Sequence, residues 1–202
     1  MGRYSAQNTF LSTPSWPTSF PKEVIGIERN GIVIRQQETP SNIEEMEFIP
    51  ESLEAIKLMR MKGYNVIFFF NEPKILGNQS HLQVVENSNT KMMEVFGNHG
   101  IMSINGLYFS TSNLKDDIYA LPNNGMLKKA EAEMNLKFKG GYFVGDKLQD
   151  LKAGDSLHSN PILIQQGLYE ETQKKLNTFA NKKLKSKVKE YKTLLDFAMS
   201  LK

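Results

Sequence analysis

The apolar run NVIFFF at residues 65–70 limits the folds open to this chain more than any other segment. A strand with one face in water alternates apolar and polar residues, whereas this run is apolar at every position after the first. Such a strand is typical of a parallel sheet that helices cover on both faces. The run therefore favours an α/β fold.

Further apolar runs alternate with helical patterns along the chain. We expect strands in the runs at 24–27, 65–70, 106–109, 142–144 and 161–164, with a further apolar run at 32–34. We expect helices at 50–63, about 80–98, 125–136, 148–154 and in two closing stretches, the last with helical spacing from Val188 to Ala198. This alternation predicts an α/β fold of the doubly wound type, built on one parallel sheet.

The loops that follow three of these strands carry the polar residues of interest. Ligands of doubly wound folds gather at the carboxyl ends of the strands, so the loops after Ile27, Phe70 and Val144 should meet at one place. Asp146 follows Val144 closely, and Asp150 comes four residues later. Two carboxylates at this spacing indicate a magnesium site, although acids at a helix start also cap its free amides.

Length and composition bound the remaining possibilities. A chain of 202 residues is long enough for one well-buried domain and short for two. The absence of cysteine excludes disulfides and a cysteine-ligated zinc site. The net charge of +3 is too small to indicate nucleic-acid binding. Residues 174–192 hold eight lysines against one acid, Glu190, which is typical of a solvated helix face, with an anion-binding patch as the alternative.

Residues 1–22 are rich in Ser, Thr and Pro and contain the only tryptophan, Trp16. They lack the apolar run of a secretion signal, and no stretch approaches the roughly 20 apolar residues that span a bilayer. We therefore expect a cytoplasmic protein with an extended N-terminal arm, 1–22, and one domain, 23–202. The arm and the lysine-rich C-terminal region are the candidate surfaces for a protein partner.

The order of elements and four landmarks are similar to those of the haloacid dehalogenase (HAD) superfamily. The landmarks are EFIPESLEAIKLMRMKGYNVIFFFNE, NNGMLKKAEAEMNL, GYFVGDKLQDLKAG and VKEYKTLLDFA. They most resemble parts of the small histidinol-phosphate and D-glycero-D-manno-heptose 1,7-bisphosphate phosphatases, and the likeness covers about residues 23–200. The resemblance implies a Rossmann-like, HAD-like single domain without a large cap.

The resemblance also assigns positions in the phosphatase reaction. In that family an aspartate ending the first strand attacks phosphorus, and a second aspartate two residues later serves as acid and base. Here Glu28 takes the nucleophile position and Asn30 the acid/base position, in Glu-Arg-Asn-Gly instead of Asp-Arg-Asp-Gly. Phe70 replaces the phosphate-binding hydroxyl, although the next residue, Asn71, is kept. Leu121 replaces the phosphate-binding lysine.

Only the fourth motif, with Asp146, Lys147 and Asp150, is whole. The resemblance implies that its acids hold Mg²⁺, and Glu28 would complete a candidate set of three carboxylates. Lys147 would hold a phosphate or pair with an acid. No zinc is expected, because the zinc loop of the heptose phosphatases falls on residues that form no zinc cluster: Ser110, Ser112, Asp117 and Tyr119.

Four changes at phosphoryl-handling positions predict lost chemistry. The leading hypothesis is a catalytically degenerate phosphatase homologue, a pseudoenzyme, that keeps a cleft for a cation or a small phosphorylated ligand and acts through binding or assembly. The alternative is an active, divergent, magnesium-dependent sugar-phosphate phosphatase that uses Glu28. A third reading is an interaction module that contacts its partner through residues 1–22 or the lysine-rich region.

Overall fold

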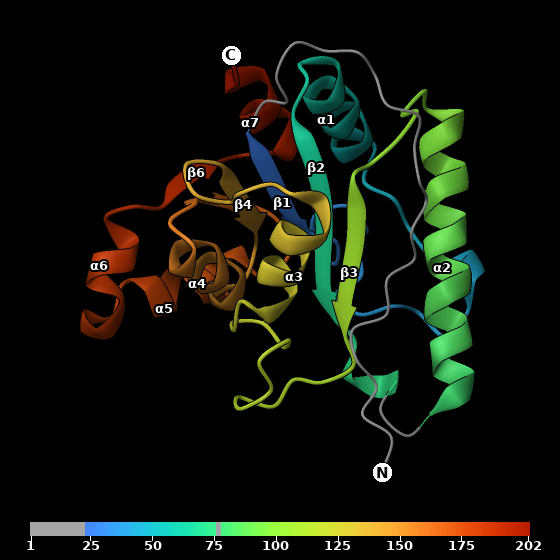
Figure 1. Ribbon diagram of the computed structural model, residues 1–202, viewed down its shortest axis with the longest axis horizontal. Helices are drawn as coiled ribbons and strands as arrows, with labels where there is room; N and C mark the ends of the chain where they lie inside the picture. The colour runs from blue at the N-terminus through green and yellow to red at the C-terminus, as the bar shows by residue number, and fades with distance from the viewer. Residues whose placement is uncertain (1–22, 76–77) are drawn as a thin grey trace.

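The computed structural model describes residues 23–75 and 78–202, so the expected arm at 1–22 lies outside the described residues. The strands are β1 (Val24–Glu28), β2 (Asn65–Asn71), β3 (Gly106–Ser110), β4 (Tyr142–Gly145), β5 (Asn160–Ile164) and β6 (Lys189–Tyr191). They form one sheet in the order β3-β2-β1-β4-β5-β6, and every pairing is parallel (Figure 1). This arrangement confirms the predicted doubly wound α/β fold.

Seven α-helices connect these strands within the described part of the chain. They are α1 (Pro50–Met61), α2 (Gln79–Asn98), α3 (Gly125–Met134), α4 (Leu148–Ser156), α5 (Tyr169–Leu176), α6 (Lys182–Lys185) and α7 (Leu194–Ser200). Pro50 occupies the first helical position of α1, where its missing N–H leaves no intrahelical bond unmade. Residues 23–75 and 78–202 form one domain, with no separate cap domain among them.

Side chains of β2 alternate between two apolar layers, as expected of a strand that is covered on both faces. Phe68 and Phe70 pack into the layer that contains α1, α2 and α7. Ile67 and Phe69 pack into the opposite layer with α3 and part of α4. All four side chains are fully buried, so the apolar run is the middle of the core.

The register of the sheet determines which residues share its carboxyl edge. Glu28 of β1 pairs with Phe69 of β2, and Ile27 pairs with Val144 of β4. The residue after Val144 and the residue after Ile27 therefore lie at the same level of neighbouring strands. This places the first and fourth motifs side by side at one end of the sheet.

The expected closing helix from Val188 was wrong at its beginning. Residues Lys189–Tyr191 form the edge strand β6, in which Tyr191 pairs with Ile164 of β5. α7 begins only at Leu194, because the Thr193 hydroxyl accepts a hydrogen bond from the Asp196 backbone N at 3.0 Å and caps the helix.

The apolar run at 32–34 lies outside the strands. Its residues are buried, and Ile34 makes isolated bridges to Asn30 and Phe48. Among the helices described for residues 23–75 and 78–202, we find none with the length and apolar character needed to cross a membrane.

Candidate functional site

Four charged side chains meet where β1 and β4 end. Glu28 is the last residue of β1, Asp146 and Lys147 follow β4, and Asp150 lies in the first turn of α4. Lys147 Nζ lies 3.3 Å from Glu28 Oε1. The exposed fraction is 1% for Glu28 and 0% for Asp146 and Asp150. The expected meeting of the first and fourth motifs is therefore confirmed, and Lys147 pairs with an acid.

Both acids of the fourth motif also hold the backbone at a helix start. Asp150 Oδ2 accepts a hydrogen bond from Lys147 N at 3.0 Å, just before α4. Asp146 Oδ2 accepts hydrogen bonds from Leu168 N, just before α5, at 2.7 Å and from Gln37 Nε2 at 2.9 Å. Asp150 thus matches the alternative reading of a cap on the helix that follows, whereas Asp146 holds the start of a later helix, α5. These contacts leave the second oxygen of each carboxyl group for another role.

Two glycines let these carboxyl groups approach the backbone closely. A Cβ atom at Gly145 would lie 2.3 Å from Asp150 Oδ2, well inside contact distance. Gly167 has a φ of +52°, and a Cβ there would lie 1.9 Å from Asp146 Oδ2. A larger residue at either position would displace an acid of the fourth motif.

The charges of the site do not balance. Three carboxyl groups face one ammonium group, so full ionisation would leave an excess of negative charge in a buried place. Burial, together with the nearby Asp146, raises the pKa of Glu28 to about 7, although Lys147 opposes the shift. Burial also raises the pKa of Asp146 and, more strongly, the pKa of Asp150. Burial by itself would lower the pKa of Lys147, but the three acids outweigh burial and raise it.

Each of the three carboxyl groups also has one buried oxygen without a hydrogen-bond partner: Glu28 Oε2, Asp146 Oδ1 and Asp150 Oδ1. Buried polar atoms normally have a partner, and carboxylate oxygens are the ligands that Mg²⁺ prefers. Across residues 23–75 and 78–202, no group of three or more His, Asp or Glu residues is arranged to hold a metal. The candidate set of three is therefore not gathered around one point. The donors do fit Mg²⁺ held by one or two carboxylates and water, the usual way in which proteins bind this ion.

Arg29, between the two altered catalytic positions, was not singled out by the sequence analysis. Its side chain is fully buried and donates hydrogen bonds to four polar side chains: Asn30, Thr39, Ser88 and Asn89. Burial lowers the pKa of Arg29 to about 10, against the opposing effect of nearby acids. The sequence did offer one signal for Arg29, namely a positively charged residue directly after a strand that was expected to be buried.

Glu72 is a second residue that sequence reasoning missed. Its carboxyl group is 1% exposed, and its Oε2 accepts a hydrogen bond from Thr39 N at 3.1 Å. The same oxygen lies 4.0 Å from the Arg29 guanidinium, and Oε1 lies 3.2 Å from His81 Nε2. Glu72 thus joins the end of β2 to the loop after β1 and to α2.

Phe70, at the position of the phosphate-binding hydroxyl, is part of the packed core. Its ring is fully buried and stacks on Phe109, with ring centroids 5.4 Å apart. The guanidinium of Arg29 also lies over the Phe70 ring, 3.5 Å from its centroid. The ring therefore has no free face for a ligand.

Leu121 and Asn71 hold one another rather than an anion. The Asn71 side chain donates to Leu121 O at 3.1 Å and accepts from Leu121 N at 3.0 Å. The Leu121 side chain is 2% exposed and packs with α3. The loop that corresponds to the zinc loop is closed by its own contacts, since Ser112 N donates to Ser110 Oγ and Tyr119 N donates to Asp117 Oδ1.

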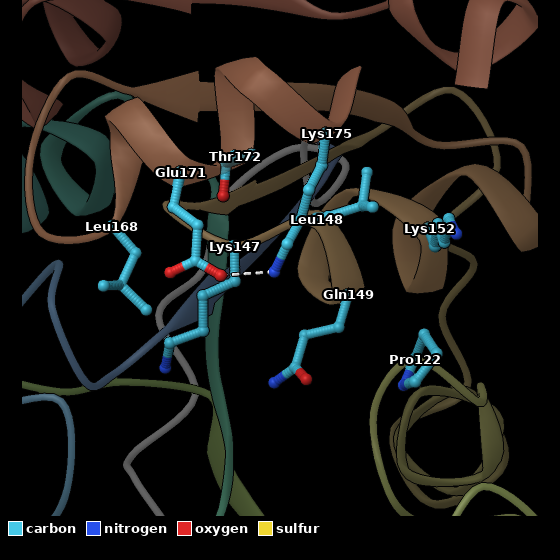
Figure 2. Close-up of a pocket in the computed structure, with 9 residues that line it drawn as sticks. All are labelled: Pro122, Lys147, Leu148, Gln149, Lys152, Leu168, Glu171, Thr172 and Lys175. Carbon is cyan, nitrogen blue, oxygen red and sulfur yellow. Dashed lines mark hydrogen bonds and ion pairs between the residues drawn. The ribbon is translucent and has the colours of Figure 1, made fainter. Parts of the chain in front are cut away.

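A cavity of 310 Å³ lies beside Lys147, between the start of α4 and α5. Figure 2 shows its lining, with Lys147 and Gln149 from the start of α4 facing Glu171 and Lys175 of α5. Lys175 is paired with Glu171 (Figure 2), while Lys152 makes no ion pair with any described residue. Since Lys147 is paired with Glu28 and Lys175 with Glu171, Lys152 is the lysine of the lining that no acid among the described residues neutralises.

No family model matches the chain. A D-glycero-beta-D-manno-heptose-1,7-bisphosphate 7-phosphatase of Pseudomonas aeruginosa is 25% identical over 149 residues, covering 72% of this chain and 83% of the relative. A phosphatase of the same description from Neisseria meningitidis serogroup A is 24% identical over 178 residues, covering 87% of this chain and 92% of the relative. The recognisable likeness thus extends over most of both proteins.

Solved structures with the same fold include D,D-heptose 1,7-bisphosphate phosphatases from two bacteria. The one from B. bronchiseptica, complexed with magnesium and phosphate, has a TM-score of 0.76 at 19% identity and covers 88% of this chain and 97% of its own. The one from Burkholderia thailandensis has a TM-score of 0.63 at 21% identity, with the same coverage. The resemblance expected from the sequence is confirmed.

Proposed function

We propose that this chain, which has the HAD-like fold and resembles heptose-bisphosphate phosphatases, is a catalytically degenerate homologue that acts by binding a small phosphorylated ligand. The observation that carries the proposal is the packing of Phe70. A phosphatase of this type needs a hydroxyl at that position to hold the phosphoryl group. The ring found there is fully buried and contacts both Phe109 and the guanidinium of Arg29, so no ligand can reach it without repacking of the core.

The acid/base position supports the same conclusion. The Asn30 carboxamide does not ionise near neutral pH, so it can act neither as a general acid nor as a general base. Its Oδ1 accepts a hydrogen bond from Arg29 Nε at 2.9 Å. Loss of a general acid/base costs about 10²–10⁴ in rate. The longer side chain of Glu28 displaces the attacking oxygen, and a displacement of about 1 Å can cost roughly 10²-fold. These losses are not additive, but they act on a reaction that needs a very large acceleration.

The cavity beside Lys147 supports the binding role. Lys152 offers a phosphate or another small anion an ammonium group that no described residue neutralises. It lies at the carboxyl ends of the strands, where ligands of such sheets gather. A phosphorylated ligand could therefore bind here without reaching the altered catalytic positions.

The test combines an assay of turnover with a measurement of binding. With heptose 1,7-bisphosphate and Mg²⁺, we expect no phosphate release above the background of the Asp146→Ala variant; release that this variant abolishes would overturn the proposal. Inorganic phosphate, titrated calorimetrically, should bind the wild type and bind Lys152→Glu about tenfold more weakly, since one lost charge pair is worth about 1–2 kcal/mol. Lys115→Glu, in the loop before α3 and outside the lining of the cavity, is the control.

A second candidate, an active divergent magnesium-dependent phosphatase, is favoured by one observation at Glu28. A pKa of about 7 and a buried, unpartnered Oε2 suit a group that gives and takes a proton or attacks phosphorus. Mg²⁺ held by Glu28 and Asp146 would offset the charge of the phosphoryl group. A fluoroberyllate adduct on Glu28 would support this candidate, and its absence at saturating fluoroberyllate and Mg²⁺ would count against it.

A further inference from the structure

Phe179 is the most exposed large apolar side chain among residues 23–75 and 78–202, with an exposed fraction of 93%. It begins the short 3₁₀ turn Phe179–Asn181, which lies between α5 and α6. Figure 1 shows these two helices at the left edge of the molecule, on the opposite side from α2. The ring therefore contributes nothing to the packing of the domain.

The turn that carries this ring is fixed by hydrogen bonds and by the packing on either side of it. Thr178 Oγ1 donates to Lys175 O at 2.8 Å, and Asn181 Nδ2 donates to the same carbonyl oxygen at 2.9 Å. Leu176, before the turn, and Leu184, after it, are buried in one apolar cluster. A loose loop could fold its ring inward, whereas this turn holds the ring in solvent.

Positive charge surrounds the turn. Residues 176–189 contain five lysines and no acid. All three lysines of α6 are exposed, and none of them forms an ion pair with a described residue: Lys182, Lys183 and Lys185. The backbone N of Lys182 donates a hydrogen bond to Phe179 O, so α6 follows the ring directly. The exposed ring and the three unneutralised ammonium groups thus belong to one surface.

We propose that this surface, formed by Phe179, Lys182, Lys183 and Lys185, is a peripheral contact with a bilayer of anionic lipids. The ring would enter the boundary between headgroups and acyl chains, while the ammonium groups would stay at the level of the lipid phosphates. An apolar anchor and a polybasic cluster are each weak alone and bind stably together. A merely solvated lysine face would account for the charges but not for the ring.

A bilayer suits the ring better than the other anionic partners do. Nucleic acids and acidic proteins also attract lysines, but they can bury a single projecting ring only where a fitted site exists. A bilayer offers an apolar phase at every point of its surface. The shape of the turn therefore favours lipid, and the other two partners become outcomes of the test.

The test is co-sedimentation of the intact protein with vesicles of phosphatidylcholine, with or without about one third phosphatidylserine. We expect binding to the anionic vesicles only, weakening as salt is raised. Phe179→Ala should weaken it about tenfold through lost apolar burial. Lys182→Ala with Lys183→Ala should weaken it about thirtyfold, since each lysine near such a surface contributes about fivefold.

The matched controls are Met102→Ala, whose side chain is 78% exposed elsewhere on the molecule, and Lys115→Ala, in the loop before α3. Both should bind as the wild type does, and equal unfolding temperatures would show that all the variants are folded. Absence of binding to anionic vesicles, or binding that Phe179→Ala leaves unchanged, would overturn the proposal. Tighter binding to a single-stranded oligonucleotide or to polyglutamate than to the vesicles would overturn it too, by assigning the lysines to nucleic acid or to an acidic protein.

Discussion

The guanidinium carbon of Arg29 lies 3.5 Å from the centroid of the Phe70 ring, and both side chains are fully buried. A buried cation over an aromatic face is stabilised by the ring and by its hydrogen bonds, here to Asn30, Ser88 and Asn89 among others. By the resemblance, Phe70 takes the position of the hydroxyl that holds the phosphoryl group in such phosphatases, and Arg29 lies between the nucleophile and acid/base positions. Their packing therefore couples the stability of the fold to the loss of phosphatase chemistry that we propose.

Phe70→Thr should lower the free energy of unfolding by about 3 kcal/mol or more, because it removes a buried ring and leaves a cavity under Arg29. Urea unfolding measures the change. Phe179→Thr is the control: its side chain is 93% exposed, and its loss should change stability by less than about 0.5 kcal/mol. Equal effects of the two substitutions would contradict the packing role of Phe70.

Arg29→Ala should cost about 3–5 kcal/mol of unfolding free energy, because it leaves the buried Glu72 carboxyl group and four polar side chains without their guanidinium partner. Arg35→Ala removes the ion pair with Glu47 at the surface, where both side chains are 66% exposed. That change should cost less than about 1 kcal/mol. An effect at Arg29 no larger than that at Arg35 would contradict the stabilising role of the buried guanidinium.

Stability should fall as the pH rises from 4.5 to 7. In the unfolded chain Glu28 has its ordinary pKa of 4.5, whereas burial raises its pKa to about 7 in the folded protein. The folded state thus binds more protons between these values, and the contribution present below pH 4.5, roughly 3 kcal/mol, is lost by the time the pH passes 7. In a buffer that contains a metal chelator, Glu28→Gln should flatten the dependence of the unfolding free energy on pH between these values. Glu47→Gln, at the surface, should leave that dependence unchanged.

Mg²⁺ should raise the free energy of unfolding at pH 8, because it would offset the buried negative charge of Glu28 and Asp146. At a concentration of about 100 times Kd the gain is about 2.7 kcal/mol. Asp146→Asn should remove this gain, and Asp155→Asn, whose carboxylate pairs with Lys187 at the surface, should keep it. Equal gains in all three proteins would show that the ion acts elsewhere.

Introducing the phosphatases' residues at the four altered positions tests whether the loss of chemistry that we propose is confined to them. We expect the combination Glu28→Asp, Asn30→Asp, Phe70→Thr and Leu121→Lys to give measurable phosphatase turnover with Mg²⁺ at a temperature where the variant remains folded. The same protein with Asp146→Ala should lose it. A folded but inactive combination would mean that the Arg29 and Glu72 network has also reshaped the site.

The sequence by itself predicted the alternation of strands and helices along the chain. An apolar run such as 65–70 is stable as a strand when helices cover both faces of its sheet. It also identified Asp146 and Asp150 by their spacing after an apolar strand, whereas Glu28 and Lys147 were assigned by the resemblance to the phosphatases. The edge strand β6 was missed because three exposed or half-exposed residues carry no apolar period, and their pairing with β5 is a tertiary contact.

Only the tertiary structure decided what the altered positions do. Nothing local to Arg29, Glu72 or Thr39 indicates that they form one network, because their contacts join segments from three parts of the chain. The charge of the site also depends on tertiary structure. The pKa of a carboxyl group shifts only once folding has buried the group and fixed the charges around it. Local pattern specifies elements, whereas long-range packing specifies which polar groups are left to bind a ligand.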